Sequence, residues 1–174
     1  MSLHRLRHIA SQEDCQLWLV DLDAPPLPQE FECLAADELA RAGRFTFARD
    51  RERFLAGRAA LRVLLGRRTG QPPAALRLDC GPYGKPFLPG SGVPAFNMSH
   101  SQGLGLVAVS ETSAPPASIG VDIEVLRPVP DALELAAVAG FEPDECAQLQ
   151  ALGETAARDT AFLLGWTPKE ACLK

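Results

Sequence analysis

The chain has 174 residues, enough for one ordinary domain or for two small lobes with a hydrophobic core. Hydrophobic residues make up 47% and charged residues 22%, which excludes a disordered or fibrous protein. The formal net charge is −5, no apolar run approaches the roughly 18 residues that span a bilayer, and the N-terminus lacks the apolar core of a signal peptide, so we expect no membrane association.

The first part of the sequence predicts one strand and two helices. We expect a strand over Cys15–Leu22, and a helix over Glu30–Ala42 that ends at Gly43. A second helix, capped by Asp50, is expected to run to about Gly66, because apolar residues recur there at helical intervals.

The rest of the chain favours short strands followed by helices. Residues 81–86 are typical of a rigid turn rich in glycine and proline. Strands are expected over Leu76–Cys80, Ala95–His100, Gly103–Ser110 and Ile119–Val125. Helices are expected over Asp131–Ala139, Pro143–Leu152 and from Ala156 to the end. Strands and helices do not alternate regularly, so the fold class is α+β and not a doubly wound sheet.

Positive charge is concentrated in one segment. Between Arg41 and Arg68, nine arginines stand against Asp50 and Glu52, which leaves a local balance of +7. Because a general nucleic-acid-binding protein is usually basic overall, this segment indicates a site for a small polyanion and no nucleic-acid partner. An arginine-rich helix face in solvent explains the segment equally well.

The cysteines indicate a reduced, cytoplasmic protein. They are odd in number, widely spaced and form no CxxC pair, which argues against a disulfide or zinc scaffold. They are Cys15, Cys33, Cys80, Cys146 and Cys172.

Two acids in the last expected strand could bind a metal ion. Asp122 and Glu124 are two residues apart, so a strand would place both carboxylates on one face. Such a pair suits Mg²⁺, which completes its octahedron with water and phosphate oxygens. The alternative is that this face is simply exposed to solvent.

A second candidate lies at the end of the chain. Glu170 and Lys174 are four residues apart, so a helix presents them together. Alternatively, Thr167 and Glu170 form a capping box with Pro168 at the first helical position, and Lys174 is the surface ion-pair partner of Glu170. For Pro168 we expect a kink or a fresh helix start.

The sequence contains no P-loop and no GxGxxG motif. Phosphates would therefore need another cradle, such as the arginines together with backbone N–H groups around Ser99 and His100. A single histidine such as His100 is more often a packed or surface residue than a catalytic one.

Five motifs in order resemble the 4′-phosphopantetheinyl transferase family, in particular its two-lobed members that activate peptide and polyketide synthases. The resemblance covers about three-quarters of the chain. Its motifs are RAGRFTFARDRERFLAG over Arg41–Gly57, GKP over Gly84–Pro86, NMSHS over Asn97–Ser101, IGVDIE over Ile119–Glu124 and WTPKEACLK over Trp166–Lys174.

The resemblance implies a fold of two similar α+β lobes related by a pseudo-twofold axis, with coenzyme A in the cleft between them. The lobes would be residues 1–117 and 118–174. Because members of this type continue beyond the last motif, we expect the second lobe to be truncated at its C-terminal end.

The resemblance also implies residue roles. For coenzyme A, Arg41 and Arg53, helped by Arg44, match positions that hold the 3′-phosphate. Gly84, Lys85 and Pro86 match the turn beside the adenine. Asn97, Ser99 and His100 belong to the motif that contacts the phosphates.

The resemblance assigns the metal ligands as well. For Mg²⁺, Asp122, Glu124 and Glu170 match the binding acids. Lys174 matches a lysine that reaches the pyrophosphate, and Glu170 is the candidate for accepting the serine proton. Glu38 stands where some relatives have a further cation.

The expected activity is therefore transfer of 4′-phosphopantetheine from coenzyme A to a serine of an apo acyl- or peptidyl-carrier protein, with Mg²⁺ and by a monomer. The chain would release 3′,5′-adenosine bisphosphate. A fragment that binds coenzyme A or the carrier protein without catalysis is the alternative. A Mg²⁺-dependent nucleotide hydrolase would leave the NMSHS and GKP motifs unexplained.

Overall fold

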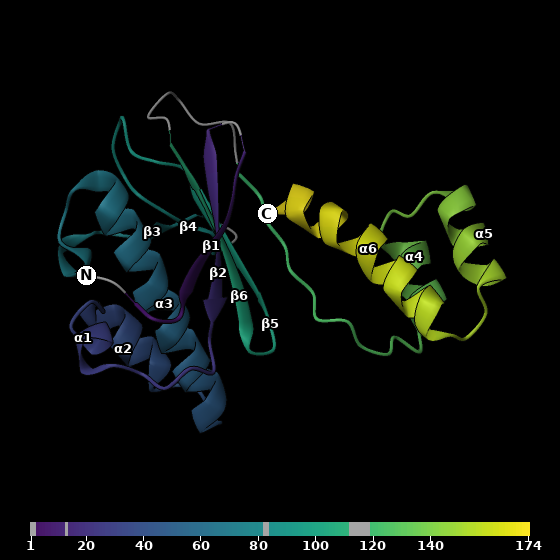
Figure 1. The fold of residues 1–174 in the computed structure, drawn as a ribbon, viewed down its shortest axis with the longest axis horizontal. Coiled ribbons are helices and arrows are strands. Elements are labelled where there is room, and N and C mark those ends of the chain that lie inside the picture. Colours follow the sequence, from purple (N-terminus) through teal and green to yellow (C-terminus); the bar gives the residue numbers. More distant parts are fainter. Residues whose placement is uncertain (1–2, 13, 82–83, 112–118) are drawn as a thin grey trace.

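A computed structural model describes residues 3–12, 14–81, 84–111 and 119–174. The chain forms a sheet covered on one side by helices, followed by a separate group of three helices (Figure 1). An extended segment that carries the two candidate acids leads from the first group to the second (Figure 1). The expected lobe boundary at 117/118 lies outside the described residues.

The main sheet has four antiparallel strands in the order β1-β2-β6-β5. Its strands are β1 (Leu6–Gln12), β2 (Cys15–Asp21), β5 (Phe96–Ser101) and β6 (Leu104–Ser110). The predicted strands at 15–22, 95–100 and 103–110 are confirmed, whereas β1 was not predicted. Strand β5 is an edge strand, and its outer side faces the second group of helices.

The predicted helix over Glu30–Ala42 is wrong as a single element. It is divided into α1 (Pro28–Phe31) and α2 (Ala36–Ala42), because the Glu38 carboxylate accepts a hydrogen bond from the Ala35 N–H and so begins a new helix. Helix α3 (Ala48–Thr69) is longer than expected, with Phe47 and not Asp50 at its N-cap. It ends at Gly70, whose φ of 72° is the left-handed conformation that glycine favours.

Between α3 and β5 the chain forms little regular structure. A 3₁₀ turn, η1 (Pro73–Ala75), is followed by a two-stranded ribbon of β3 (Asp79–Cys80) and β4 (Pro86–Phe87). The predicted strand over Leu76–Cys80 is therefore confirmed only at its last two residues, because the partner β4 is equally short.

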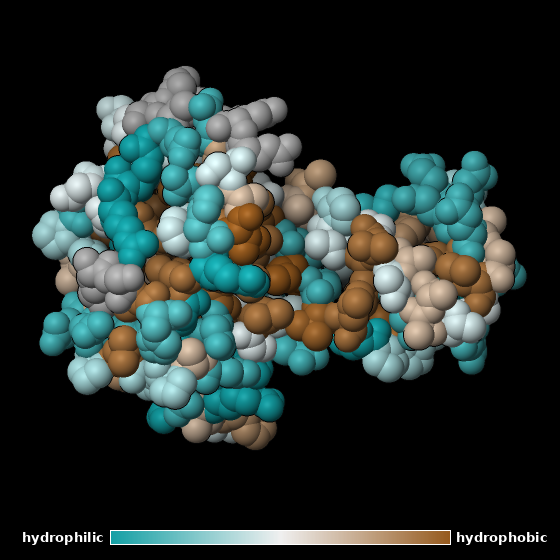
Figure 2. Space-filling model, in the orientation of Figure 1, coloured by the Kyte–Doolittle hydropathy of each residue, from teal (hydrophilic) through white to brown (hydrophobic). Residues whose placement is uncertain are grey.

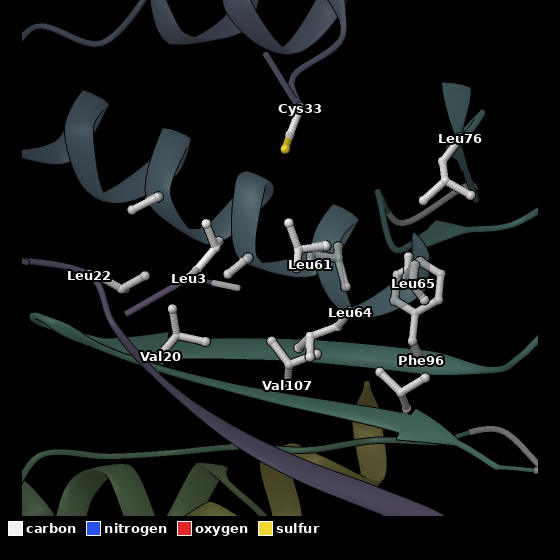
Figure 3. Packing of buried hydrophobic residues seen from close by; sticks show 14 residues of the cluster. Leu3, Val20, Leu22, Cys33, Leu61, Leu64, Leu65, Leu76, Phe96 and Val107 are labelled. Atoms are coloured by element: carbon white, nitrogen blue, oxygen red, sulfur yellow. The ribbon is translucent and has the colours of Figure 1, made fainter. Parts of the chain in front are cut away.

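The first hydrophobic core lies between α3 and the sheet (Figure 3). Small residues on α3 allow the close approach: a Cβ on Gly57 would lie only 2.6 Å from the Met98 Cε. Burial of the leucines and valines removes apolar surface from water, which is the main stabilising force of such a core. The largest fully buried side chains of this core are Val20, Leu61, Val63, Leu65 and Val107.

A second core joins the three C-terminal helices, α4 (Ala132–Val138), α5 (Pro143–Ala151) and α6 (Ala156–Leu173). All three were predicted to within two residues at each end. Phe162 stacks on Phe141 at 5.4 Å between ring centroids and contacts Trp166 at 5.6 Å. A side chain on Gly165 would collide with the Phe141 ring, so glycine is required there.

Helix α6 continues through Pro168. The predicted fresh helix start is wrong, and so is the capping box: the Thr167 hydroxyl donates to the Leu163 carbonyl one turn back, at 2.7 Å. Residue 168 lacks an N–H to donate. The surrounding packing of Phe162 and Trp166 keeps the helix continuous, and it thus carries Lys174 towards the sheet (Figure 1).

The predicted strand over Ile119–Val125 is also wrong, since these residues form no backbone ladder. Instead the segment is held by side chains. Lys85 donates to the Ile119 carbonyl at 2.9 Å, and the Ser101 hydroxyl accepts from the Val125 N–H at 3.2 Å. Alternating polarity therefore predicted a strand that does not form, because side chains satisfy backbone groups that a neighbouring strand would otherwise pair.

None of the described helices is long and apolar enough to cross a membrane. Apolar side chains nevertheless gather in the middle of the face seen in Figure 2, where the chain passes from the sheet to the helices.

Glu38 is a structural residue at the centre of the arginine-rich segment. Its side chain is only 3% exposed and lies 2.5 Å from both Arg58 Nε and Arg62 Nε. Arg62 also donates to the carbonyls of Pro73 and Leu76. Part of the local positive charge is thus neutralised inside the fold, so the interpretation of this segment as a solvated helix face is wrong at these two arginines.

We expect Glu38→Ala to lower the free energy of unfolding by about 3 to 5 kcal/mol, because it leaves Arg58 and Arg62 without their buried counter-charge. Denaturant unfolding followed by circular dichroism would measure this loss. Glu32→Ala, at an exposed acid that follows α1, should change the value by less than about 0.5 kcal/mol. Equal stability of the two variants would contradict this role for Glu38.

Candidate functional site

A cavity of about 740 Å³ opens between α2, α3, the β3–β4 ribbon and β5. Apolar side chains such as Leu61, Leu78 and Met98 line part of it, and charged side chains line the rest. Five of the residues expected to bind coenzyme A are among its lining residues: Arg41, Arg53, Gly84, Pro86 and His100. The cavity has the mixed lining that a nucleotide-like ligand with an apolar ring and phosphate groups requires.

Aromatic rings position Arg41 at this cavity. Its guanidinium carbon lies 5.3 Å from the centroid of the Phe54 ring, and Phe45 packs on Phe54 at the same centroid distance. A second hollow, of about 440 Å³, is lined by Arg41, Arg44 and Phe45. Arg41 and Phe45 therefore border both cavities, whereas Arg44 borders only the second of these two.

Arg53 is held by a partner that the sequence did not indicate. Its Nε and one terminal nitrogen donate to both carboxylate oxygens of Asp23, at 2.6 and 2.7 Å. The hydrogen bonds from Arg53 hold the pKa of Asp23 below its usual range. Gly103 lies against the Asp23 carboxylate, so any larger residue at 103 would displace it. The two hydrogen bonds to Asp23 fix the plane of the Arg53 guanidinium at the cavity wall.

The side chains of the NMSHS motif on β5 lie on both faces of the sheet, because successive side chains in a strand point in opposite directions. Met98 and His100 face α3 and line the cavity. Asn97, Ser99 and Ser101 face the extended segment and the end of α6. The structure thus brings His100 to the arginines but places Asn97 and Ser99 in a second, polar cluster.

This polar cluster joins three distant parts of the chain. The Ser99 hydroxyl donates to Asp122 Oδ1 at 2.6 Å, and Lys174 Nζ lies 2.5 Å from the same oxygen and 3.0 Å from the Ser99 hydroxyl. Asn97 donates to the Lys174 carbonyl at 3.3 Å. Gly120 makes the approach possible, since a Cβ there would collide with the Ala171 carbonyl of α6. Lys174 pairs with Asp122, so its expected surface ion pair with Glu170 is wrong.

The two candidate acids of the extended segment both contact β5. Glu124 Oε2 accepts from the Ser101 hydroxyl at 2.9 Å, two residues along from the Ser99–Asp122 contact. The Asp122 side chain is 3% exposed, and its Oδ2 has no hydrogen-bond partner among the described residues. A buried carboxylate oxygen without a partner is uncommon and suits a cation or water.

Glu170 is not gathered with these acids. Among the residues that the structure describes, no three His, Cys, Asp or Glu side chains lie close enough to hold a metal ion together. Lys85, expected beside the adenine, instead reaches the Ile119 carbonyl and helps to hold the extended segment.

Sequence reasoning missed Asp23, Phe54 and Ser101. Phe54 lies within the arginine-rich motif and Ser101 closes the NMSHS motif, so their positions in the motifs were the available signal. No signal in the sequence indicated Asp23, because its contact with Arg53 joins residues 30 positions apart.

Comparisons with known proteins agree with this organisation. A family profile described as "4'-phosphopantetheinyl transferase, N-terminal" matches residues 25–112. A second profile, "4'-phosphopantetheinyl transferase superfamily", matches residues 118–174. The two profiles meet near the extended segment, and together they cover both groups of helices.

Individual relatives support the same assignment. The 4'-phosphopantetheinyl transferase HetI of Nostoc sp. is 42% identical over 93% of this chain and 68% of its own length. The Synechocystis sp. protein slr0495 is 39% identical over 91% of this chain and 63% of its own length. A 4'-phosphopantetheinyl transferase of Bacillus subtilis is 30% identical over 81% and 59%. The chain thus spans about two thirds of the length of these relatives.

We expect the Asp23 carboxyl to titrate below the ordinary aspartate pKa of about 3.9 because it receives two hydrogen bonds from Arg53. The ion pair then stabilises the fold above that ordinary pKa, and the contribution is lost as the pH falls through the lowered value. Carboxyl ¹³C NMR would measure the titration. In Arg53→Ala the pKa of Asp23 should return to its ordinary value, and an unchanged pKa in that variant would contradict the assignment.

Proposed function

Because the chain belongs to the 4′-phosphopantetheinyl transferase family, we propose that it transfers the 4′-phosphopantetheine group of coenzyme A to a serine of an apo acyl- or peptidyl-carrier protein. The observation that carries this proposal is the arrangement of β5. One face of this strand borders an arginine-lined cavity, and the other binds an acid–lysine cluster. A nucleotide with two separate phosphate groups needs such a pair of neighbouring sites.

The cavity side would bind the adenosine end of coenzyme A. Arg41 and Arg53 would hold the 3′-phosphate, with Arg44 beside them, because the guanidinium fork matches phosphate oxygens. The turn residues Gly84 and Pro86 line the same cavity and would lie beside the adenine. His100 would meet the phosphates where they leave this cavity.

The cluster side would bind the pyrophosphate. Asp122 and Glu124 would hold Mg²⁺, and the unpartnered Oδ2 of Asp122 suits this hard, oxygen-preferring cation. When bound, Mg²⁺ would neutralise the pyrophosphate charge. Two protein carboxylates suffice for such a site when phosphate and water oxygens supply the other ligands.

The reaction would be a phosphoryl-type transfer governed by positioning and charge. The carrier serine oxygen forms a bond to the β-phosphorus, and the bond from that phosphorus to the bridging oxygen breaks. Glu170 accepts the serine proton, and 3′,5′-adenosine bisphosphate leaves with the bonding electrons. Lys174 stabilises the negative charge on the leaving phosphate. We further propose that the enzyme acts as a cytoplasmic monomer with lobes at 1–117 and 118–174.

The direct test is intact mass spectrometry of an apo carrier protein incubated with this chain, coenzyme A and Mg²⁺. We expect the carrier to gain one phosphopantetheine, and EDTA should prevent the gain. Asp122→Asn, which keeps the side-chain shape but removes the charge, should lower the rate at least a hundredfold while the circular dichroism spectrum stays unchanged. A folded wild-type chain that produces no mass gain would contradict the proposed activity.

Arg41→Ala should weaken the binding of coenzyme A about tenfold or more but leave dephospho-coenzyme A almost unaffected, because only the former carries a 3′-phosphate. A charge-assisted hydrogen bond to phosphate contributes about 1.5 to 3 kcal/mol. Isothermal titration calorimetry would measure both dissociation constants. Arg51→Ala, at an exposed arginine in the first turns of α3, is the matched control. An equal loss for the two ligands would refute the role of Arg41.

A further inference from the structure

The extended segment that carries both candidate acids is attached to the sheet in an unusual way. It runs beside the edge strand β5 but forms no backbone ladder with it. The polar contacts described between them are made by serine hydroxyls of the strand. The positions of the carboxylates therefore depend on individual side chains and not on a regular sheet.

Two serines of β5 match two acids of the segment, with the same spacing of two residues. Ser99 donates to Asp122 and receives a hydrogen bond from Lys174. Ser101 donates to Glu124 at 2.9 Å and accepts from the Val125 N–H at 3.2 Å. One hydroxyl can make both contacts at once, because it has one donor and two acceptor positions.

Ser101 stands on a rigid element. It is the last residue of β5, pairs with Leu104 across the hairpin, and precedes Gln102, whose φ of 52° forms the tight turn. Beyond the turn, the Gly103 carbonyl accepts from the Leu22 N–H at 2.8 Å, which ties the hairpin to the chain after β2. The Ser101 hydroxyl is therefore held in a fixed position, and the extended segment, which lacks backbone pairing with a strand, is hydrogen-bonded to it.

We propose that Ser101 is a positioning residue for the metal-binding acids: its hydroxyl fixes Glu124 and the backbone at Val125, and thereby sets the geometry of the Asp122–Glu124 pair. The inference rests on the proposed function, in which these acids hold Mg²⁺. Hydrogen-bond partners of metal ligands commonly change metal affinity by ten- to a hundredfold when they are removed. Ser101 engages one carboxylate oxygen of Glu124, and a cation would be bound through the other.

The test compares three variants. Ser101→Ala removes the hydroxyl, and Ser101→Thr retains it. Ser110→Ala is the matched control, because the Ser110 hydroxyl also accepts a backbone N–H, that of Ala95 at 2.9 Å, but lies at the opposite end of the same hairpin. Binding of Mn²⁺ in the presence of saturating coenzyme A is measured by electron paramagnetic resonance, and binding of coenzyme A without metal is measured by calorimetry.

We expect Ser101→Ala to weaken Mn²⁺ binding about tenfold with an unchanged dissociation constant for coenzyme A. Ser101→Thr should bind Mn²⁺ like the wild type, and Ser110→Ala should change stability without changing Mn²⁺ affinity. Wild-type Mn²⁺ affinity in Ser101→Ala, or an equal loss in Ser110→Ala, would overturn the inference while leaving the proposed transfer intact. Absence of Mn²⁺ binding in the wild-type chain would overturn both this inference and the proposed metal site.

Discussion

The alternation of side chains along β5 is the constraint on which the rest of the candidate site depends. On the face of the sheet turned away from α3, β5 presents the hydroxyls of Ser99 and Ser101, which donate to Asp122 and Glu124 of the extended segment. The residues between them face α3 and the arginine-lined cavity. A shift of one residue in the β5–β6 register would exchange the two sets, so the Met98–Val107 and His100–Gly105 pairings also fix which groups meet which part of a ligand.

Buried charges in this fold are neutralised by partners far away in the sequence. Arg5 is paired with Glu30, Arg58 and Arg62 share Glu38, and Lys174 is paired with Asp122. A charge buried without a partner would cost several kcal/mol, so these contacts hold loops and helices where weak local propensity would not. The arginines of the arginine-rich segment therefore have different roles. Arg58 and Arg62 stabilise the fold, whereas Arg41 borders the cavity with only an aromatic ring as its described partner.

Elements whose signal is local could be predicted. The hairpin of β5 and β6 and the three C-terminal helices follow from residue periodicity, and the spacing of Asp122 and Glu124 correctly indicated that both face one neighbour. The Ile119–Val125 segment could not be predicted, because alternating polarity does not show whether a strand will find a backbone partner. The Asp23–Arg53 pair and the burial of Glu38 depend on contacts across 20 or more residues, which one sequence does not reveal. A fresh helix start at Pro168 was predicted wrongly because packing of α6 outweighs one missing hydrogen bond.

The side-chain attachment of the acid segment has a physical consequence for the chemistry that we propose. A backbone ladder would fix the carboxylates rigidly, with several hydrogen bonds that must break together. Single contacts from Ser99, Ser101 and Lys174 contribute only about 0.5 to 3 kcal/mol each and can be exchanged one at a time. Lys174 balances the charge of Asp122, and in the reaction that we propose the pyrophosphate would compete for the same ammonium group. The cluster can therefore exchange an internal ion pair for a bound cation and anion at low cost, while the hairpin that carries Ser99 and Ser101 stays in place.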